Sequence, residues 1–214
     1  STSTLTLTSV ETIQLTGGGT SQKIAASDIS GVSFTLSEAG AGTAVLTVVA
    51  DQTTINLSNL SFDNSFAVGT DSILIDASGA ASGVTITGTS GNDTITGSNA
   101  DDILTGGEAA DTISGGTGDD TISGGGGADT LTGGAGDDEF DLTSESSTEA
   151  EMDSISDFQA DADEEHNDKI DNITGTVGAD TSNIDVKSAI SSGSGSETVT
   201  ASVTTGIVTL SGAD

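Results

Sequence analysis

The sequence contains no cysteine, proline, tryptophan or tyrosine. Without cysteine, the chain can form neither a disulfide framework nor a thiolate metal site. Only 32% of the 214 residues are hydrophobic and the only aromatic side chains are five phenylalanines, so any core must be thin. The residues that are common, chiefly Thr, Ser, Gly, Asp, Ile, Leu and Val, favour short β-strands joined by tight turns. The composition therefore predicts an all-β fold.

Positive charge is almost absent as well. Lys23, Lys169 and Lys187 are the only basic residues against 34 acidic ones, which gives a formal net charge of −31. Such an imbalance repels nucleic acid and anionic lipid, and it opposes compaction unless cations are bound. No apolar run approaches the ~20 residues of a membrane helix. We therefore expect no nucleic-acid partner and no transmembrane segment.

Residues that assemble catalytic sites are scarce. There is one histidine, His166, in an acidic stretch, and neither an H-E-x-x-H nor a G-x-S-x-G motif occurs. Few side chains therefore remain for acid-base or nucleophilic chemistry. We expect the chain not to be an enzyme.

The chain divides into four segments by composition. Residues 1–87 are poor in charge and rich in alternating β-branched residues, which indicates strands and makes this segment a candidate solenoid. Residues 88–141 are a repeat, residues 142–171 form an acidic segment expected to cap it, and residues 172–214 return to polar β character. The chain begins at Ser1 without a leader-like segment, so we expect a processed product or part of a longer protein.

The repeat consists of six consecutive nonapeptides that begin at Gly88. They read GTSGNDTIT, GSNADDILT, GGEAADTIS, GGTGDDTIS, GGGGADTLT and GGAGDDEFD. The sixth position is always aspartate, at Asp93, Asp102, Asp111, Asp120, Asp129 and Asp138. The eighth is always apolar, at Ile95, Leu104, Ile113, Ile122, Leu131 and Phe140. Two columns in register over six repeats predict a solenoid with one structural unit per repeat.

Each nonapeptide combines a glycine-rich loop with a short strand. Glycine lets the loop turn its carbonyl oxygens inward, and the following Asp adds a carboxylate, a mixture of oxygens that suits Ca²⁺ better than Mg²⁺. Doubled acids recur every eighteen residues, as at Asp101-Asp102 and Asp119-Asp120, which indicates two motifs per coil. Aspartates of successive coils, ~4.8 Å apart, could then share a cation. Without a cation they repel, so we expect residues 88–141 to fold only with Ca²⁺.

These nonapeptides resemble the repeats-in-toxin (RTX) family of secreted bacterial proteins. The resemblance implies a parallel β-roll within a β-solenoid, with several Ca²⁺ ions, about four or more, held between motifs n and n+2. It implies ions shared by Asp93/Asp111, Asp102/Asp120, Asp111/Asp129 and Asp120/Asp138. The carbonyls that complete the sites would come from the first and third loop positions, Gly88, Ser90, Gly97, Asn99, Gly106, Glu108, Gly115, Thr117, Gly124, Gly126, Gly133 and Ala135. The pattern departs from the family at Thr89 and Ser98, which replace the second glycine, and at Ala100 and Ala109, which replace the fourth.

A further stretch after the repeat resembles the segment that often ends such rolls. Ile155-Ser156-Asp157-Phe158, followed by Lys169-Ile170-Asp171, looks like the family's I-x-D-F and D-K-I-D motifs. On this resemblance, Asp157 and Asp171 are further candidate metal ligands.

Two functional classes remain open. In the first, the chain is an extracellular structural protein, part of a surface layer, filament or adhesin, that assembles with itself and has a surface polysaccharide as a further candidate partner. In the second, it is the calcium-binding tail of a secreted enzyme or toxin. We favour the first because residues 1–87 read as Thr-rich β material and resemble surface-layer proteins with the same nonapeptides. Both imply secretion to a calcium-rich medium, and the family resemblance implies type I secretion.

Overall fold

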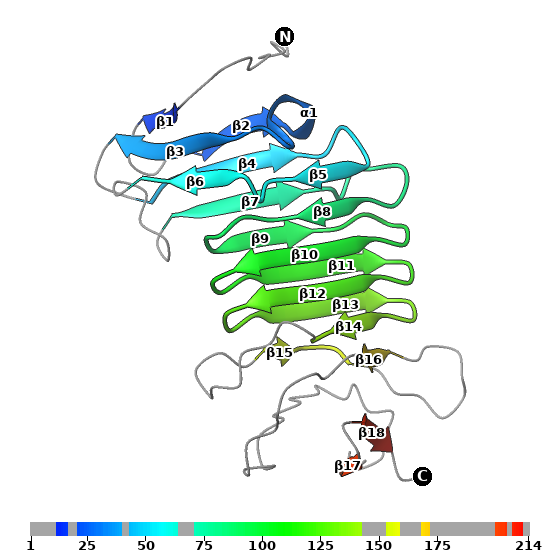
Figure 1. Ribbon diagram of the computed structural model, residues 1–214. Helices are drawn as coiled ribbons and strands as arrows, with labels where there is room; N and C mark the ends of the chain where they lie inside the picture. The colour runs from blue at the N-terminus through cyan, green and yellow to red at the C-terminus, as the bar shows by residue number, and fades with distance from the viewer. Residues whose placement is uncertain are drawn as a thin grey trace.

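The chain folds as a β-solenoid of parallel strands (Figure 1). The computed structural model describes residues 12–16, 21–39, 43–63, 71–142, 153–158, 168–171, 200–204 and 207–211. Helix is confined, within these residues, to the single short α1 (Ala26–Ile29), and no described helix is long and apolar enough to cross a membrane. The all-β class and the solenoid predicted from the sequence are confirmed. Most of the segments 142–171 and 172–214 lies outside the described residues.

Two parallel sheets form the walls of the solenoid. The seven-stranded wall contains β2 (Ser21–Ala25), β4 (Val45–Val49), β7 (Ser72–Asp76), β9 (Asp93–Thr96), β11 (Thr112–Thr117), β13 (Thr130–Ala135) and β15 (Ser154–Ile155). The six-stranded wall contains β5 (Thr54–Asn56), β8 (Thr85–Thr87), β10 (Ile103–Glu108), β12 (Thr121–Gly126), β14 (Glu139–Asp141) and β16 (Lys169–Asp171). Successive strands of the chain alternate between the walls from β7 onward, so each pair makes one coil.

Two smaller sheets complete the described structure. A parallel three-stranded sheet contains β1 (Thr12–Thr16), β3 (Phe34–Ala39) and β6 (Leu60–Phe62). An antiparallel pair contains β17 (Thr200–Thr204) and β18 (Ile207–Ser211).

The length of a coil changes along the solenoid. In the nonapeptide segment, Thr112 pairs with Thr130, and the spacing between equivalent residues is 18. Nearer the N-terminus, β4 and β7 are paired at a spacing of 27 residues. After the repeat, the two walls gain β15 at a spacing of 24 and β16 at a spacing of 30. The same walls therefore run through the repeat and through the strands on both sides of it, with longer connections outside it.

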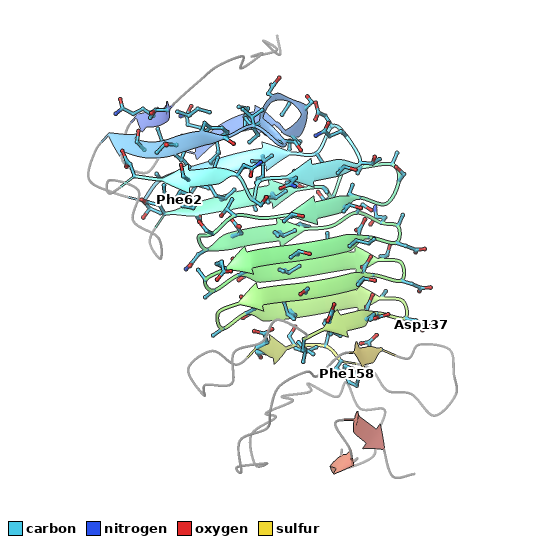
Figure 2. The ribbon with its side chains drawn as sticks, viewed as in Figure 1. Phe62, Asp137 and Phe158 are labelled. Atoms are coloured by element: carbon cyan, nitrogen blue, oxygen red, sulfur yellow. The ribbon has the colours of Figure 1, made fainter. Side chains whose placement is uncertain are left out.

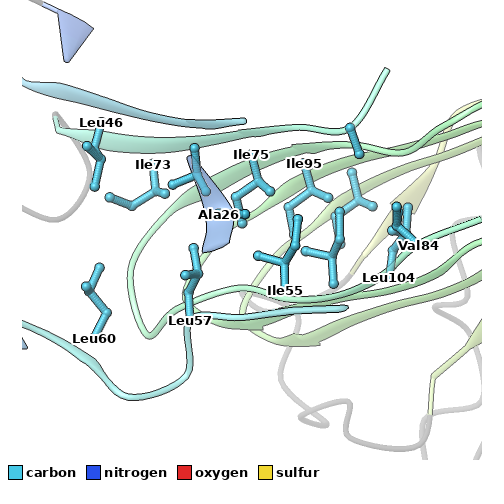
Figure 3. Close-up of a cluster of buried hydrophobic side chains, with 14 of the residues drawn as sticks. Ala26, Leu46, Ile55, Leu57, Leu60, Ile73, Ile75, Val84, Ile95 and Leu104 are labelled. Carbon is cyan, nitrogen blue, oxygen red and sulfur yellow. The ribbon is translucent and has the colours of Figure 1, made fainter. Parts of the chain in front are cut away.

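A narrow apolar interior separates the walls. Strand residues alternate inward and outward, and in the nonapeptides the inward apolar column is Ile95, Leu104, Ile113, Ile122, Leu131 and Phe140, all at most 1% exposed. Figure 3 shows Ile75 and Ile95 of one wall facing Ile55 and Leu104 of the other. One apolar side chain per nonapeptide is a small amount of burial, so this part of the solenoid needs another source of stability.

A second inward column changes character along the chain. In the seven-stranded wall it is apolar at Leu46 and Ile73, and then Ile73 pairs in register with Asp93. The six-stranded wall makes the same change, because Thr85 pairs with Ile103 and so places Val84 beside Asp102. Both walls therefore exchange apolar side chains for aspartate where the nonapeptides begin.

Candidate metal centre

Six aspartate side chains lie inside the solenoid instead of on its surface. Asp93, Asp102, Asp111, Asp120, Asp129 and Asp138 are each only 1–2% exposed. Each precedes or opens a strand whose next inward residue is the buried apolar one, so the local sequence Asp-x-U sets the direction of the carboxylate. A buried carboxylate is costly unless hydrogen bonds or a cation compensate it.

One oxygen of five of these carboxylates, all except that of Asp93, accepts a hydrogen bond from a neighbouring coil. Oδ1 of Asp111 accepts the backbone N–H of Asp93 at 2.8 Å, and Oδ1 of Asp129 accepts that of Asp111 at 2.7 Å. In the other wall, Asp120 and Asp138 accept from the N–H groups of Asp102 and Asp120 at 2.8 and 2.9 Å. We call this the aspartate ladder. It links successive coils through the residues that the sequence placed in one column.

The second oxygen of four carboxylates has no such bond. Oδ2 of Asp111, Asp120, Asp129 and Asp138 is buried without a hydrogen-bond partner in the described residues. A buried anionic oxygen left in this state is a strong indication of an additional ligand. These atoms are therefore the best evidence in the structure for bound cations.

The space beside these oxygens is shaped by glycine. A Cβ atom on Gly106 would collide with Oδ2 of Asp111 and would lie 2.6 Å from the carbonyl oxygen of Gly124 in the next coil. A Cβ atom on Gly115 would likewise collide with Oδ2 of Asp120 and would lie 2.6 Å from the carbonyl oxygen of Gly133. A carboxylate oxygen and a carbonyl oxygen from two successive coils thus lie close together beside a glycine, in a space too small for a side chain. We call this arrangement a glycine cradle.

The donor set matches Ca²⁺. Among the described residues, no three His, Cys, Asp or Glu side chains gather to hold a metal by themselves. The liganding atoms on offer are instead one or two carboxylates with backbone carbonyls, which are hard oxygen donors in a loop of adaptable geometry. Residues of this kind would hold Ca²⁺, and the ion would supply the positive charge that compensates the buried carboxylates.

The electrostatics of the metal-free ladder agree with a cation requirement. Burial, reinforced by the charges of Asp93, Asp129 and Asp153, raises the pKa of Asp111 to about 9. Burial and the neighbouring Asp102 and Asp138 raise the pKa of Asp120 to about 7. The pKa values of Asp129 and Asp138 are raised too, again chiefly by burial. Without a cation, the charged form of Asp111 is therefore disfavoured at neutral pH, and the charged forms of the other three are less favoured than in water.

The loop residues expected from the sequence lie as follows. The first-position glycines, Gly88, Gly97, Gly106, Gly115, Gly124 and Gly133, are all buried, and each lies beside the carboxylate of its own motif. The third-position residues Ser90, Asn99, Glu108, Thr117 and Ala135 expose their side chains, and Gly126 is half-buried. The carbonyl of Ala135 accepts the N–H of Gly118 at 2.9 Å.

Asp157 and Asp171 lie at the end of the solenoid. The two carboxylate oxygens of Asp157 accept the N–H groups of Gly133 and Gly134 at 2.9 and 2.8 Å, so this side chain closes the last glycine loop. Asp171 belongs to β16, where it pairs with Asp141 of β14. Phe158, which is labelled in Figure 2, packs near Phe140, with ring centroids 6.3 Å apart.

Two members of the ladder were missed from the sequence. Oδ1 of Asp153 accepts the N–H of Asp129 at 2.9 Å, and Oδ1 of Asp168 accepts that of Asp138 at 3.1 Å. Their distances along the chain, 24 and 30 residues, break the spacing of the nonapeptides. The signal that could have found them is the local pattern Asp-x-Ile, which recurs at Asp153-Ser154-Ile155 and Asp168-Lys169-Ile170.

Comparison with known families agrees with this geometry. The family model of the RTX calcium-binding nonapeptide repeat, which describes four copies, matches residues 85–113 and 105–140. The chain carries RTX calcium-binding nonapeptide repeats. The matched residues contain all six ladder aspartates of the repeat, and the description of this family names calcium as the ion that such repeats bind. A search among curated proteins finds no match to the chain.

Proposed function

We propose that this chain is an extracellular structural protein in which Ca²⁺ completes the folding of the solenoid and thereby permits assembly into a surface layer, filament or adhesin. The observation that carries the proposal is the set of buried, unsatisfied Oδ2 atoms beside glycine cradles. Because ligands of this kind are present only in the folded coil, the free energy of ion binding contributes directly to folding.

The strands before the RTX segment support a structural role over a tail attached to an enzyme. Strands β2, β4 and β7 belong to the same parallel sheet as β9, β11 and β13, so the N-terminal part continues the solenoid instead of forming a separate catalytic unit. A solenoid with long, regular walls offers its surfaces and ends for repeated contacts with other copies. No catalytic role is proposed.

The calcium requirement also supports a location outside the cell. Sites built from one or two carboxylates and backbone carbonyls on a flexible loop belong with extracellular modules, whose dissociation constants are about 10⁻⁴–10⁻³ M. Such sites stay empty at cytosolic calcium and fill in a calcium-rich medium. An affinity in this range favours secretion of the unfolded chain, which then folds outside the cell when Ca²⁺ binds.

The test follows the purified chain through a calcium titration. Circular dichroism reports folding, and light scattering with electron microscopy reports assembly, each with Mg²⁺ as the control ion. We expect β structure to increase with Ca²⁺ and not with equal Mg²⁺, and ordered assemblies to form only in the calcium-loaded state. A chain that folds fully in Ca²⁺ yet stays monomeric at every concentration tested would contradict the assembly role and favour the tail of a secreted enzyme.

A further inference from the structure

The first two RTX loops differ from the other four at their second position. Gly107, Gly116, Gly125 and Gly134 occupy that position in the later loops and have φ angles of +130°, +123°, +105° and +115°. Side chains with a Cβ rarely adopt such angles. Thr89 and Ser98 occupy the same position in the first two loops and have no positive φ. These two loops therefore follow a different backbone path.

In the first loop, the Thr89 hydroxyl donates a hydrogen bond to the carboxylate of Asp93, the ladder residue of the same loop. Oδ2 of Asp93 accepts the backbone N–H of Thr89 at 2.6 Å and its hydroxyl at 2.9 Å. The same hydroxyl oxygen accepts the N–H of Gly91 at 3.1 Å. The hydroxyl therefore lies between the carboxylate and a loop amide, and Thr89 is only 3% exposed.

Ser98 repeats the arrangement in the second loop. Oδ2 of Asp102 accepts the N–H of Ser98 at 2.6 Å, and Oδ1 accepts its hydroxyl at 2.9 Å. The Ser98 hydroxyl in turn accepts the N–H of Ala100 at 3.2 Å. The two successive loops on either side of β9 thus have the same hydrogen-bond arrangement.

The later loops lack these hydroxyl groups, and their carboxylates differ accordingly. Oδ2 of Asp111, Asp120, Asp129 and Asp138 has no hydrogen-bond partner in the described residues, whereas Oδ2 of Asp93 and Asp102 is satisfied within its own loop. A carboxylate whose oxygens already accept an amide and a hydroxyl gains little from a cation, because the ion would have to displace both donors. In the first two loops, each Oδ2 thus already has a hydrogen-bond donor from its own loop.

We propose that the hydroxyls of Thr89 and Ser98 take the place of calcium in the first two RTX loops, so that the calcium sites begin at the third loop and the solenoid before it folds without calcium. This inference rests on calcium binding by the later loops, which is part of the proposed function. Of the four shared sites that the family resemblance implies, it removes Asp93/Asp111 and Asp102/Asp120 and keeps Asp111/Asp129 and Asp120/Asp138. It also limits the expected calcium-dependent folding to the part of the chain after Asp102.

The core before the third loop supports a calcium-independent section. Strands β4 and β7 each bury two large apolar side chains, Leu46 with Val48 and Ile73 with Ile75, where the RTX strands bury one. The interior therefore changes along the solenoid axis. It contains pairs of apolar side chains in β4 and β7, aspartates bonded to hydroxyl groups in the first two RTX loops, and, in the later loops, aspartates whose Oδ2 is unbonded among the described residues. The coil formed by β9 and β10 is thus a preformed edge to which the calcium-dependent coils can add, so that no new solenoid has to be started.

Backbone hydrogen exchange of the whole chain tests the boundary directly. In calcium-free buffer, we expect peptides from residues 71–104 to be protected at least about tenfold more than peptides from residues 112–140. Adding Ca²⁺ should raise protection in 112–140 and leave 71–104 nearly unchanged. Equal exposure of both segments without calcium, followed by equal protection with it, would overturn the inference and leave the calcium-driven folding of the proposed function intact.

Ion counting with matched variants tests the chemistry. Asp111→Asn should lose at least one bound Ca²⁺ per chain, measured by equilibrium dialysis, whereas Asp93→Asn should lose none. The double variant Thr89→Gly/Ser98→Gly removes both hydroxyls, allows the positive φ, and should gain up to two ions. Thr89→Ser is the control that keeps the hydroxyl and should retain the wild-type number.

The two proposals fail in different ways. If Asp93→Asn loses an ion as Asp111→Asn does, the first loop binds calcium and the hydroxyl inference is wrong. If neither variant changes the number because the wild-type chain binds no Ca²⁺, the calcium role itself is wrong.

Discussion

Asp119 and Asp120 are adjacent in the chain, yet their carboxylates accept hydrogen bonds from opposite neighbouring coils. Oδ1 of Asp120 accepts the N–H of Asp102 in the coil before, and Oδ1 of Asp119 accepts the N–H of Asp137 in the coil after. Asp120 is 1% exposed, while Asp119 lies on the surface in a row with Asp101 and Asp137. Asp137 is labelled at the edge of the solenoid in Figure 2. One residue of register therefore separates a candidate ligand from a surface acid.

Replacing these two residues should have unequal effects. Asp120→Ala removes a carboxylate that faces the glycine cradle and should raise the calcium midpoint of folding by at least about tenfold. Asp119→Ala removes an exposed charge and a surface hydrogen bond, where effects are small, and should shift it less than about twofold. Circular dichroism during calcium titration measures both. Equal shifts would show that the ladder is assigned to the wrong column.

The glycine cradle makes a prediction about steric fit. Gly115→Ala would push a methyl group against Oδ2 of Asp120 and the carbonyl of Gly133, and should destabilise the calcium-loaded chain by about 2–4 kcal/mol. Gly79→Ala is the matched control, because a Cβ there meets nothing within 4 Å, and it should change stability by less than about 0.5 kcal/mol. Urea unfolding at saturating Ca²⁺ gives both values. If Gly115→Ala left the free energy of unfolding unchanged, the loop around Gly115 would have to move aside for the methyl group, and the site would not be rigid.

Acidification should partly replace calcium. The folded, metal-free ladder holds protons more tightly than the unfolded chain, since the pKa of Asp111 is raised to about 9 and that of Asp120 to about 7 from an ordinary 3.8. The folded state then binds more protons than the unfolded state between these values, so its stability falls as the pH rises and increases as the pH falls. In calcium-free buffer, β structure in the RTX segment should increase from about pH 8 to about pH 5. Circular dichroism that does not change over this range would contradict the burial of these carboxylates.

The aromatic contact at the end of the repeat should stabilise the last coils. Phe158 is 7% exposed and its ring centroid lies 6.3 Å from that of Phe140, so Phe158→Ala should cost about 3 kcal/mol through lost burial. Ile103, which is 53% exposed, gives the comparison, and Ile103→Ala should cost less than about 0.5 kcal/mol. Thermal unfolding at saturating Ca²⁺ reports both. If the two variants melted alike, residues 153–158 would not be packed on the solenoid.

The sequence predicted those features that repeat at a fixed spacing. The columns of Asp93 to Asp138 and Ile95 to Phe140 determined the period, and an 18-residue coil with both columns inside follows from it. The alternation in residues 1–87 predicted strands and a candidate solenoid, and the structure places β2, β4 and β7 in the same wall as the RTX strands.

Features that depend on contacts between coils were not predictable in this way. Asp153 and Asp168 join the ladder through connections of irregular length, so their place depends on how the loops close and not on spacing. The substitutions at Thr89 and Ser98 were visible in the sequence, but their hydroxyls acquire a role only when the loop turns them onto Asp93 and Asp102. A pattern of residue types does not reveal which of two backbone paths a loop takes.

Within the described part of the chain, the strands of each RTX coil pair only with strands of the coil before it and the coil after it. Stability in such an array is a sum of nearest-neighbour terms, so it can be gained or lost one coil at a time. The calcium concentration would then set how many coils are closed, and the boundary between closed and open coils would travel along the axis. A chain of this kind can lengthen or shorten its rigid part reversibly, with the ambient ion concentration as the control.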